Sequence, residues 1–245
     1  MLHFAAMSLD AVDLRDFYAT GLGQIAARMI RRRIRSVWPD LSGQSVLGLG
    51  YATPYLNYSR DGAAHAMAAM PAAQGVLHWP SDGPGLTTLV DEAELPFPDL
   101  SIDRMILVHA LETTEQVRPM MREVWRVLSG SGRLLVVVPN RRGIWARLDR
   151  TPFGHGQPYS SGQLSRLLRE TMFTPVKSHA ALFVPPTRSR MVLASAPAWE
   201  QLGIRGKAPF AGVVMVEATK QIYAGHTVPR RRRSYVAIPQ GPNGA

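Results

Sequence analysis

The stretch SVLGLGYATPY, Ser45–Tyr55, decides the fold, because it has the pattern of a buried strand that runs into a glycine turn. Three aliphatic residues predict the strand: Val46, Leu47 and Leu49. Gly48 and Gly50 carry no Cβ, so the backbone can turn sharply there and approach a ligand closely. An α/β fold starts a nucleotide-shaped pocket in this way. A dinucleotide fingerprint, however, has a third small residue where this chain has Thr53 and Pro54.

Apolar runs and amphipathic segments alternate along the rest of the chain. Strand patterns cover Ala63–Met70, Gly75–Trp79, Ile102–His109, Leu134–Val138, Ser178–Phe183, Met191–Ala194 and Ala211–Ala218. Helical spacing of apolar residues covers Leu9–Trp38, a short segment after Pro54, Glu115–Leu128 and Ser160–Thr171. We expect Gly21 and Gly23 to break the first helix, and Gly130 and Gly132 to end the helix at Leu128. Strands separated by helices predict an α/β fold with a doubly wound, mostly parallel sheet.

The composition fits a globular protein with one main core. The chain has 245 residues, of which 46% are hydrophobic, and it contains no cysteine. We expect a single domain over residues 1–228, with an N-terminal helical cap at 1–40 and a flexible basic tail at 229–245. No apolar run is long enough for a bilayer, and the N-terminus lacks the basic start of a signal peptide, so we expect a cytoplasmic protein. We predict no metal site, since thiolate ligands and thiolate nucleophiles are excluded.

The positive charge is concentrated in arginine clusters. The formal net charge is +10, and the clusters are Arg31–Arg33 with Arg35, Arg141 with Arg142, and Arg230–Arg233. Such clusters can bind phosphates or anionic membrane surfaces. The alternative interpretation is a solvated helix face followed by a basic tail.

Two longer segments carry a resemblance to a known family. They are VDEAELPFPDLSIDRMILVHALETTEQVRPMMREVWRVLSGSGRLLVVVPN, Val90–Asn140, and HGQPYSSGQLSRLLRETMF, His155–Phe173. Together with the first glycine turn, they make most of residues 45–173 resemble class I S-adenosylmethionine-dependent methyltransferases, in particular the type 11 group. The resemblance implies a seven-stranded Rossmann-like methyltransferase sheet, S-adenosyl-L-methionine as cofactor, and methyl transfer from its sulfonium to a nucleophile.

The resemblance also implies a set of cofactor-binding residues. They are Gly48, Leu49, Gly50, Tyr51, Asp91, Glu92, His109, Ala110 and Leu111. The two glycines would approach the methionine part of the donor, Asp91 would meet the adenine amino group, and His109–Leu111 would lie under the sulfonium. The first glycine motif is degenerate. Gly48 stands where the family carries an acid, and no Asp or Glu lies between Ala63 and Ala73, where an acid usually holds the ribose.

The family has no portable catalytic signature, because an activated donor needs mainly alignment and exclusion of water. Candidates for a catalytic role are His109, His155 and Tyr159. For His109 the alternative is a hydrogen-bonded core histidine. Glu112 either orients a substrate or is an acid at the start of the next helix. The connector Pro139–Tyr159 is either a lid over an anionic acceptor or a structural turn.

These observations leave three hypotheses for function. The first is a methyltransferase that acts on a small-molecule or RNA acceptor, with a small molecule preferred. The second is a binding or regulatory protein that keeps the fold and has lost catalysis. The third is a nucleic-acid or membrane-surface binder that uses the arginine clusters. The oligomeric state is not predicted.

Overall fold

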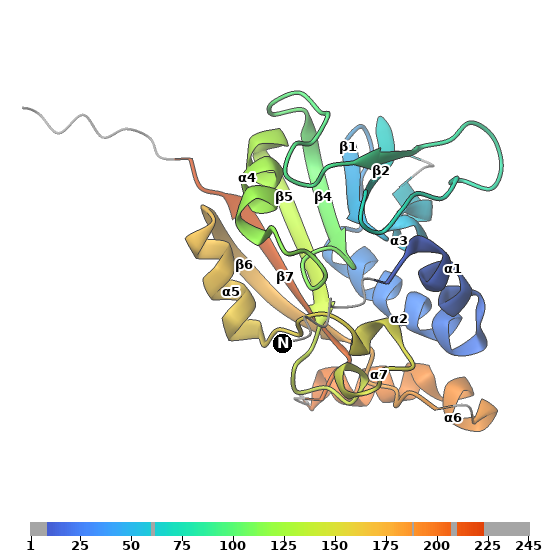
Figure 1. Ribbon diagram of the computed structural model, residues 1–245. Coiled ribbons are helices and arrows are strands. Elements are labelled where there is room, and N and C mark those ends of the chain that lie inside the picture. The colour runs from blue at the N-terminus through green and yellow to red at the C-terminus, as the bar shows by residue number, and fades with distance from the viewer. Residues whose placement is uncertain (1–8, 60–61, 188, 207–209, 223–245) are drawn as a thin grey trace, which may run out of the picture.

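The computed structural model describes residues 9–59, 62–187, 189–206 and 210–222, and it contains a seven-stranded sheet flanked by helices (Figure 1). The strands are β1 (Ser45–Gly50), β2 (His65–Pro71), β3 (Thr87–Val90), β4 (Ile102–Val108), β5 (Leu128–Pro139), β6 (Phe173–Ala181) and β7 (Val213–Lys220). The helices are α1 (Ala11–Ala19), α2 (Gly21–Val37), α3 (Thr53–Leu56), α4 (Val117–Val127), α5 (Ser161–Glu170), α6 (Arg190–Ala194) and α7 (Ala196–Arg205).

The strand order is β3-β2-β1-β4-β5-β7-β6, and β7 is antiparallel to both of its neighbours. The doubly wound, mostly parallel sheet of seven strands is therefore confirmed. One apolar core lies between the sheet and α1, α2 and α3, and a second lies between the sheet and α4 and α5. The strand order reverses between β1 and β4, and ligands of open α/β sheets bind beyond the carboxyl ends of the strands at such a reversal.

Two strand predictions are wrong. Residues 75–79 are irregular, and the third strand is β3, because Thr87, Thr88 and Val90 are the β-branched residues that pair well with β2. The run Met191–Ala194 forms part of α6, which is followed directly by the unpredicted helix α7. Met, Leu and Ala are good helix formers, so this short apolar run has no strong preference for a strand.

The N-terminal helix is broken at Thr20 rather than at a glycine. Thr20 is extended and caps α2, since its hydroxyl accepts the N–H of Gly23 at 3.0 Å. Gly21 and Gly23 belong to the first turn of α2. A Cβ on Gly23 would lie 2.0 Å from the carbonyl oxygen of Phe17, so this glycine lets α1 fold back closely on α2.

α5 begins where the sequence predicts, but α4 ends before the glycines that were expected to end it. α5 begins after Ser160, whose hydroxyl accepts the N–H of Gln163 in a capping box. α4 ends at Val127 because Leu128 is already extended, so Gly130 and Gly132 lie within β5 and do not end the helix.

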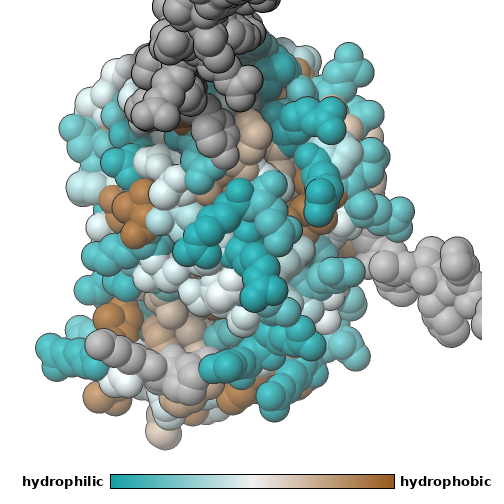
Figure 2. Space-filling model, turned by 90° about the vertical axis from the view of Figure 1, so that its left-hand side faces the viewer, coloured by the Kyte–Doolittle hydropathy of each residue, from teal (hydrophilic) through white to brown (hydrophobic). Residues whose placement is uncertain are grey.

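The surface on the side of α5 and β6 is mostly hydrophilic, and its apolar residues form separate patches (Figure 2). Within the described parts of the chain, no helix is long and apolar enough to cross a membrane. The single-domain division at residue 228 stays a prediction, and the basic tail at 229–245 lies outside the described residues.

Candidate functional site

The carboxyl ends of β1 and β4 meet closely at the two glycines of the first turn. Gly50 has a φ of +84°, and a Cβ on it would lie 2.3 Å from the carbonyl oxygen of Val108. A Cβ on Gly48 would lie 2.5 Å from Cβ of Ala52. The packing of the chain against itself therefore requires both glycines, whether or not a ligand approaches them.

Helix α1 lies across this edge of the sheet (Figure 1). At its start, the N–H of Ala11 donates to the carbonyl of Gln74 at 2.7 Å. The side-chain amide of Gln74 donates to the carbonyl of His109 and to the hydroxyl of Thr113. Gln74 follows β2 and His109 follows β4, with β1 between them, so this side chain crosses the end of β1. It occupies part of the path that a donor would take from β2 to β4.

A buried polar network lies beneath α1. The hydroxyl of Tyr18 is 2.7 Å from the hydroxyl of Tyr55 and 2.8 Å from Nε2 of His109. The Tyr18 ring stacks on Tyr51, with a centroid separation of 5.7 Å and an interplanar angle of 8°. On the far side of the imidazole, Nδ1 of His109 lies 3.2 Å from Oε1 of Glu112. His109 is thus buried and lies at hydrogen-bond distance from a hydroxyl.

The two tyrosines of this network remain protonated near neutral pH. Burial raises the pKa of Tyr18 well above its usual value, and the neighbouring Tyr55 raises it further. Burial also raises the pKa of Tyr55. One assignment satisfies the hydroxyls: Tyr55 donates to Tyr18, and Tyr18 donates to Nε2 of His109. The Nδ1–H then faces the Glu112 carboxylate, close enough for attraction but poorly aligned for a hydrogen bond.

Aromatic and connector residues close the other side of the network. The ring of Phe153 lies 5.2 Å from the ring of His109, and Trp145 packs edge-on against Phe153 at 5.4 Å. The N–H of Gln157 donates to the carbonyl of Glu112 at 2.8 Å. Protein side chains and backbone therefore fill the crevice above β4.

Glu112 differs from its sequence-based interpretation. Helix α4 begins at Val117, so Glu112 lies in the turn before the helix and does not act as a helix-start acid. Only 3% of Glu112 is exposed, and its carboxylate faces His109. A carboxylate this deep in the protein is rare without a partner, and His109 is the partner that the geometry supplies.

The sequence-predicted binding residues fall into two groups. Gly50, Tyr51 and the segment 109–111 surround the crevice and are buried, while Gly48 and Leu49 lie within β1. Asp91 and Glu92 lie at the end of β3. Asp91 is exposed, and its Oδ1 accepts the N–H of Ala93 at 2.8 Å. Glu92 accepts a hydrogen bond from the hydroxyl of Thr114. The structure thus brings the first group together and leaves the two acids at the rim.

The other catalytic candidates are not equivalent. His155 Nε2 lies 2.6 Å from the carbonyl oxygen of Asp149, so it anchors the connector to itself. Tyr159 is half-buried; burial and, to a smaller extent, the charge of Glu112 raise its pKa. Tyr159 therefore lies near enough to Glu112 to be affected by its charge, and His155 makes a separate contact.

A hollow of about 520 Å³ lies beside the crevice, at the end of β2. Its lining residues include Arg15, Tyr51, Met70, Trp79 and Asp82. The sequence did not predict that Asp82 lines this hollow, because the segment SDGPG that contains it has the composition of an ordinary turn. Asp82 is the one acid among the lining residues, on the side of β2 where the family usually has its ribose acid.

The residues present accommodate S-adenosylmethionine only in part. The hollow has the volume of a small-ligand site, and aromatic rings and the carboxylate of Asp82 line it. The methionine half does not fit, because Tyr18 and Gln74 occupy the space over Gly50 and His109.

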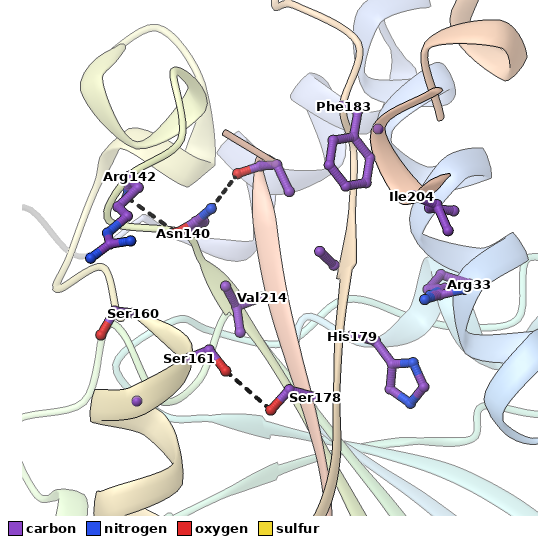
Figure 3. Close-up of a pocket in the computed structure, with 14 residues that line it drawn as sticks. Arg33, Asn140, Arg142, Ser160, Ser161, Ser178, His179, Phe183, Ile204 and Val214 are labelled. Carbon is purple, nitrogen blue, oxygen red and sulfur yellow. Dashed lines mark hydrogen bonds between the residues drawn. The ribbon is translucent and has the colours of Figure 1, made fainter. Parts of the chain in front are cut away.

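A second cavity, of about 630 Å³, lies at the β6 edge of the sheet (Figure 3). Ser160, Ser161 and Ser178 lie on the α5 side of β6, whereas Arg33 and His179 lie on the α2 side. The Ser161 hydroxyl donates to Ser178 at 3.0 Å, so part of the polar lining is already paired within the protein. Arg142 lies on the side of Ser160 and Arg33 on the opposite side, so the two arginines do not converge on one point, and the crevice at β1 and β4 is the better candidate.

Comparisons with known proteins give a matching segment and a shared fold. Residues 47–136 match the type 11 family model for a methyltransferase domain. Two curated relatives from strains of Mycobacterium tuberculosis, both named as probable S-adenosylmethionine-dependent methyltransferases, are 36% identical over 86 residues. That match covers 34% of this chain and 31% of each relative, so the chain spans about a third of the length of these relatives.

Solved structures share the fold at low identity. A S-adenosylmethionine-dependent methyltransferase from Thermotoga maritima has a TM-score of 0.59 at 13% identity, covering 86% of this chain and 95% of its own. The Haloferax volcanii methyltransferase in complex with the Trm112 activator has a TM-score of 0.61 at 15% identity, covering 86% and 98%. The [4+2]-cyclase SpnF has a TM-score of 0.54 at 18% identity, covering 82% and 83%.

The strand order and the crevice at the β1/β4 reversal define a Rossmann-like methyltransferase-fold protein. The family match covers β1 to β5, the strands and turns that form this crevice. Over residues 47–136 the chain is therefore similar to type 11 methyltransferase domains, and over most of its length it shares the fold of solved methyltransferases.

Proposed function

We propose that the protein transfers a methyl group from S-adenosylmethionine to a small-molecule acceptor. One observation carries the proposal: the segment that matches the family model is the segment that builds the crevice at the carboxyl ends of β1 and β4. The hollow beside Tyr51, Trp79 and Asp82 supports a place for the nucleoside. The acid at position 82 is a candidate replacement for the ribose acid that the sequence lacks in 63–73.

The residue that we assign to proton transfer is His109. Its Nε2 already lies at hydrogen-bond distance from a hydroxyl, that of Tyr18 at 2.8 Å. Its Nδ1 faces the Glu112 carboxylate, which would stabilise the imidazolium formed when Nε2 accepts a proton. An acceptor with a hydroxyl or ammonium group would need this step before it could act as a nucleophile. Tyr159 stays a second candidate, and His155 is better explained as a structural contact.

Contacts of the arginines favour a small acceptor over RNA. Arg31 donates to the carbonyl of Pro54 at 2.8 Å, and the guanidinium of Arg35 lies 5.5 Å from the ring centre of Tyr58. Arg33 lines the cavity at the β6 edge. These three side chains point to different neighbours, whereas a nucleic-acid site gathers its cations on one face.

Titration of the full chain with S-adenosylmethionine and S-adenosylhomocysteine tests the donor assignment. Saturable heat and a thermal shift at or below millimolar donor support the proposal. Absence of both at millimolar donor would contradict it and favour the alternative of a binding or regulatory protein with a degenerate donor site.

The assignment of His109 is tested by measuring methyl-transfer rates together with the donor titration. His109→Ala should remove methylation of a hydroxyl acceptor, while saturable binding of S-adenosylhomocysteine remains. His155→Ala is the matched control, and it should leave the rate unchanged. Equal rates for His109→Ala and the wild type would remove the imidazole from the reaction.

A further inference from the structure

Helix α1 presents one narrow face to the crevice. Ala11, Leu14 and Tyr18 recur at helical spacing and are buried, whereas Val12 on the outer side is 43% exposed. Two hydrogen-bonded points hold the ends of this face: Ala11 N–H to Gln74, and the Tyr18 hydroxyl to Tyr55 and His109. The helix therefore bridges from the end of β2 to the end of β4.

Tyr18 occupies the place that the proposed function gives to the donor. Its ring stacks on Tyr51, which follows the glycine turn, and its hydroxyl reaches His109 at the end of β4. The Tyr18 ring is therefore held between the two segments expected to hold the methionine and sulfonium of S-adenosylmethionine. The donor and the Tyr18 ring cannot share this space.

The connection between α1 and α2 is short and hydrogen-bonded: the Thr20 hydroxyl donates to the carbonyl of Phe17 at 2.6 Å and accepts the N–H of Gly23 at 3.0 Å. α1 has nine residues, which is too short for a helix that is stable by itself, so its order depends on docking. A single extended residue, Thr20, joins it to the longer α2. Rotation at Thr20 would lift α1 while α2 remains packed in the core through Ala26, Ile30 and Ile34.

We propose that α1 is a gate over the donor crevice and that Tyr18 is an internal competitor of S-adenosylmethionine. This inference rests on the proposed function. In the closed form, Tyr18 fills the methionine half of the site, and the hollow near Trp79 and Asp82 remains open to the nucleoside half. Donor binding requires α1 to swing out about Thr20, so the observed affinity is reduced by the fraction of molecules that are open.

The gate predicts a gain of function on mutation. Tyr18→Ala removes the competing ring and the hydroxyl contacts, so S-adenosylhomocysteine should bind at least about tenfold more tightly than to the wild type. Leu14→Ala weakens docking of the same helix by another route and should change the affinity in the same direction. Val12→Ala, on the exposed face of α1, is the matched control and should leave the affinity unchanged.

Hydrogen exchange of the α1 amides gives a second readout that does not depend on activity. In the ligand-free wild type, amides of 11–19 should exchange through a local opening, much faster than amides of β4. Saturating S-adenosylhomocysteine should accelerate exchange in α1, whereas a ligand usually slows exchange of the segment that covers it.

The outcomes separate the gate from the function. Equal or weaker binding by Tyr18→Ala and Leu14→Ala, with clear binding by the wild type, would overturn the gate and leave the function standing. No binding by any of these proteins would contradict the function. In that case hydrogen exchange without ligand still tests whether α1 opens by itself. If the α1 amides exchange only together with those of β4, the helix does not open locally and the gate is overturned.

Discussion

The centre of the sheet and the crevice under α1 bury different kinds of side chain. In β4, α4 and β5, the buried residues are aliphatic or methionine, such as Ile106, Met121 and Val136. Under α1, the buried groups include phenols, an imidazole and a carboxylate, those of Tyr18, Tyr55, His109 and Glu112. Close packing of apolar side chains is enough to stabilise the first region. In the second region, each buried polar group also needs a hydrogen-bond or ion-pair partner.

This difference separates what holds the fold from what decides the function. The aliphatic centre would form in any protein of this architecture, with or without a ligand. The polar crevice has its partners only while α1 is docked, because Tyr18 supplies the hydroxyl that faces Nε2 of His109. Mutations in the centre should therefore act on stability, and mutations in the crevice should act on ligand affinity as well.

The largest loss of stability is expected at Gly50, where the aliphatic centre and the crevice meet. Gly50→Ala places a Cβ 2.3 Å from the Val108 carbonyl oxygen at a φ of +84°, so the free energy of unfolding should fall by about 3 kcal/mol. Urea denaturation measures the change. Gly162→Ala in α5 is the matched control, because nothing lies within 4 Å of its Cβ position. A loss below about 1 kcal/mol for Gly50→Ala would show that β1 and β4 are not packed this closely.

A smaller loss is expected from the rim of the centre. Arg126 donates to the carbonyls of Leu95 and Phe97 and pairs with Glu123 and Asp99. Arg126→Ala should lower the free energy of unfolding by about 2 kcal/mol.

Arg126→Lys should recover little of the loss, since an ammonium cannot form the planar fork. Arg122→Ala, on the exposed side of α4, serves as control and should stay within about 0.5 kcal/mol. Donor affinity should change little in either variant. A large loss of donor affinity in Arg126→Ala would contradict the claim that residues outside the crevice act on stability alone.

Within the crevice, Tyr18→Phe keeps the ring and deletes the hydroxyl that Tyr55 and His109 share. We expect a loss of about 1–2 kcal/mol in the free energy of unfolding. Tyr58→Phe is a sharp control, because among the described residues the buried Tyr58 hydroxyl has no hydrogen-bond partner. Its removal should be neutral or stabilising, and equal losses in both variants would mean that the Tyr18 network contributes nothing specific.

The rim acid gives the smallest change in stability. Asp91 is exposed, so Asp91→Ala should alter the free energy of unfolding by less than about 0.5 kcal/mol. If it meets the adenine amino group, affinity for S-adenosylhomocysteine should fall about tenfold. Asp82→Asn tests the other acid by the same titration. Unchanged affinity in the Asp91 variant would remove that residue from the site.

The sheet was predictable from the sequence because its central strands carry their own signal. The unbroken aliphatic run in 134–138 and the strand–glycine turn at 45–50 point to a parallel α/β sheet without any tertiary information. Short runs were less certain: Met191–Ala194 has no strong local preference and became helical. The pattern of polar turn residues in 81–85 also concealed that Asp82 faces a hollow.

The crevice network could not be predicted, because its contacts join distant parts of the chain. Tyr18 looks like one more apolar position of an amphipathic helix, and its partner His109 is 91 residues away. Their contact depends on the turn at Thr20, which directs α1 back over the sheet. Similarly, Glu112 has the sequence context of a helix start, and only the later beginning of α4 at Val117 leaves it free to face His109.

The most direct test of the account is a crystal structure of the full chain with S-adenosylhomocysteine. We expect the adenosine in the hollow beside Tyr51 and Trp79, the homocysteine over Gly50 and His109, and α1 displaced from the crevice. Ligand bound at the β6 edge or elsewhere, with Tyr18 still hydrogen-bonded to His109, would contradict it.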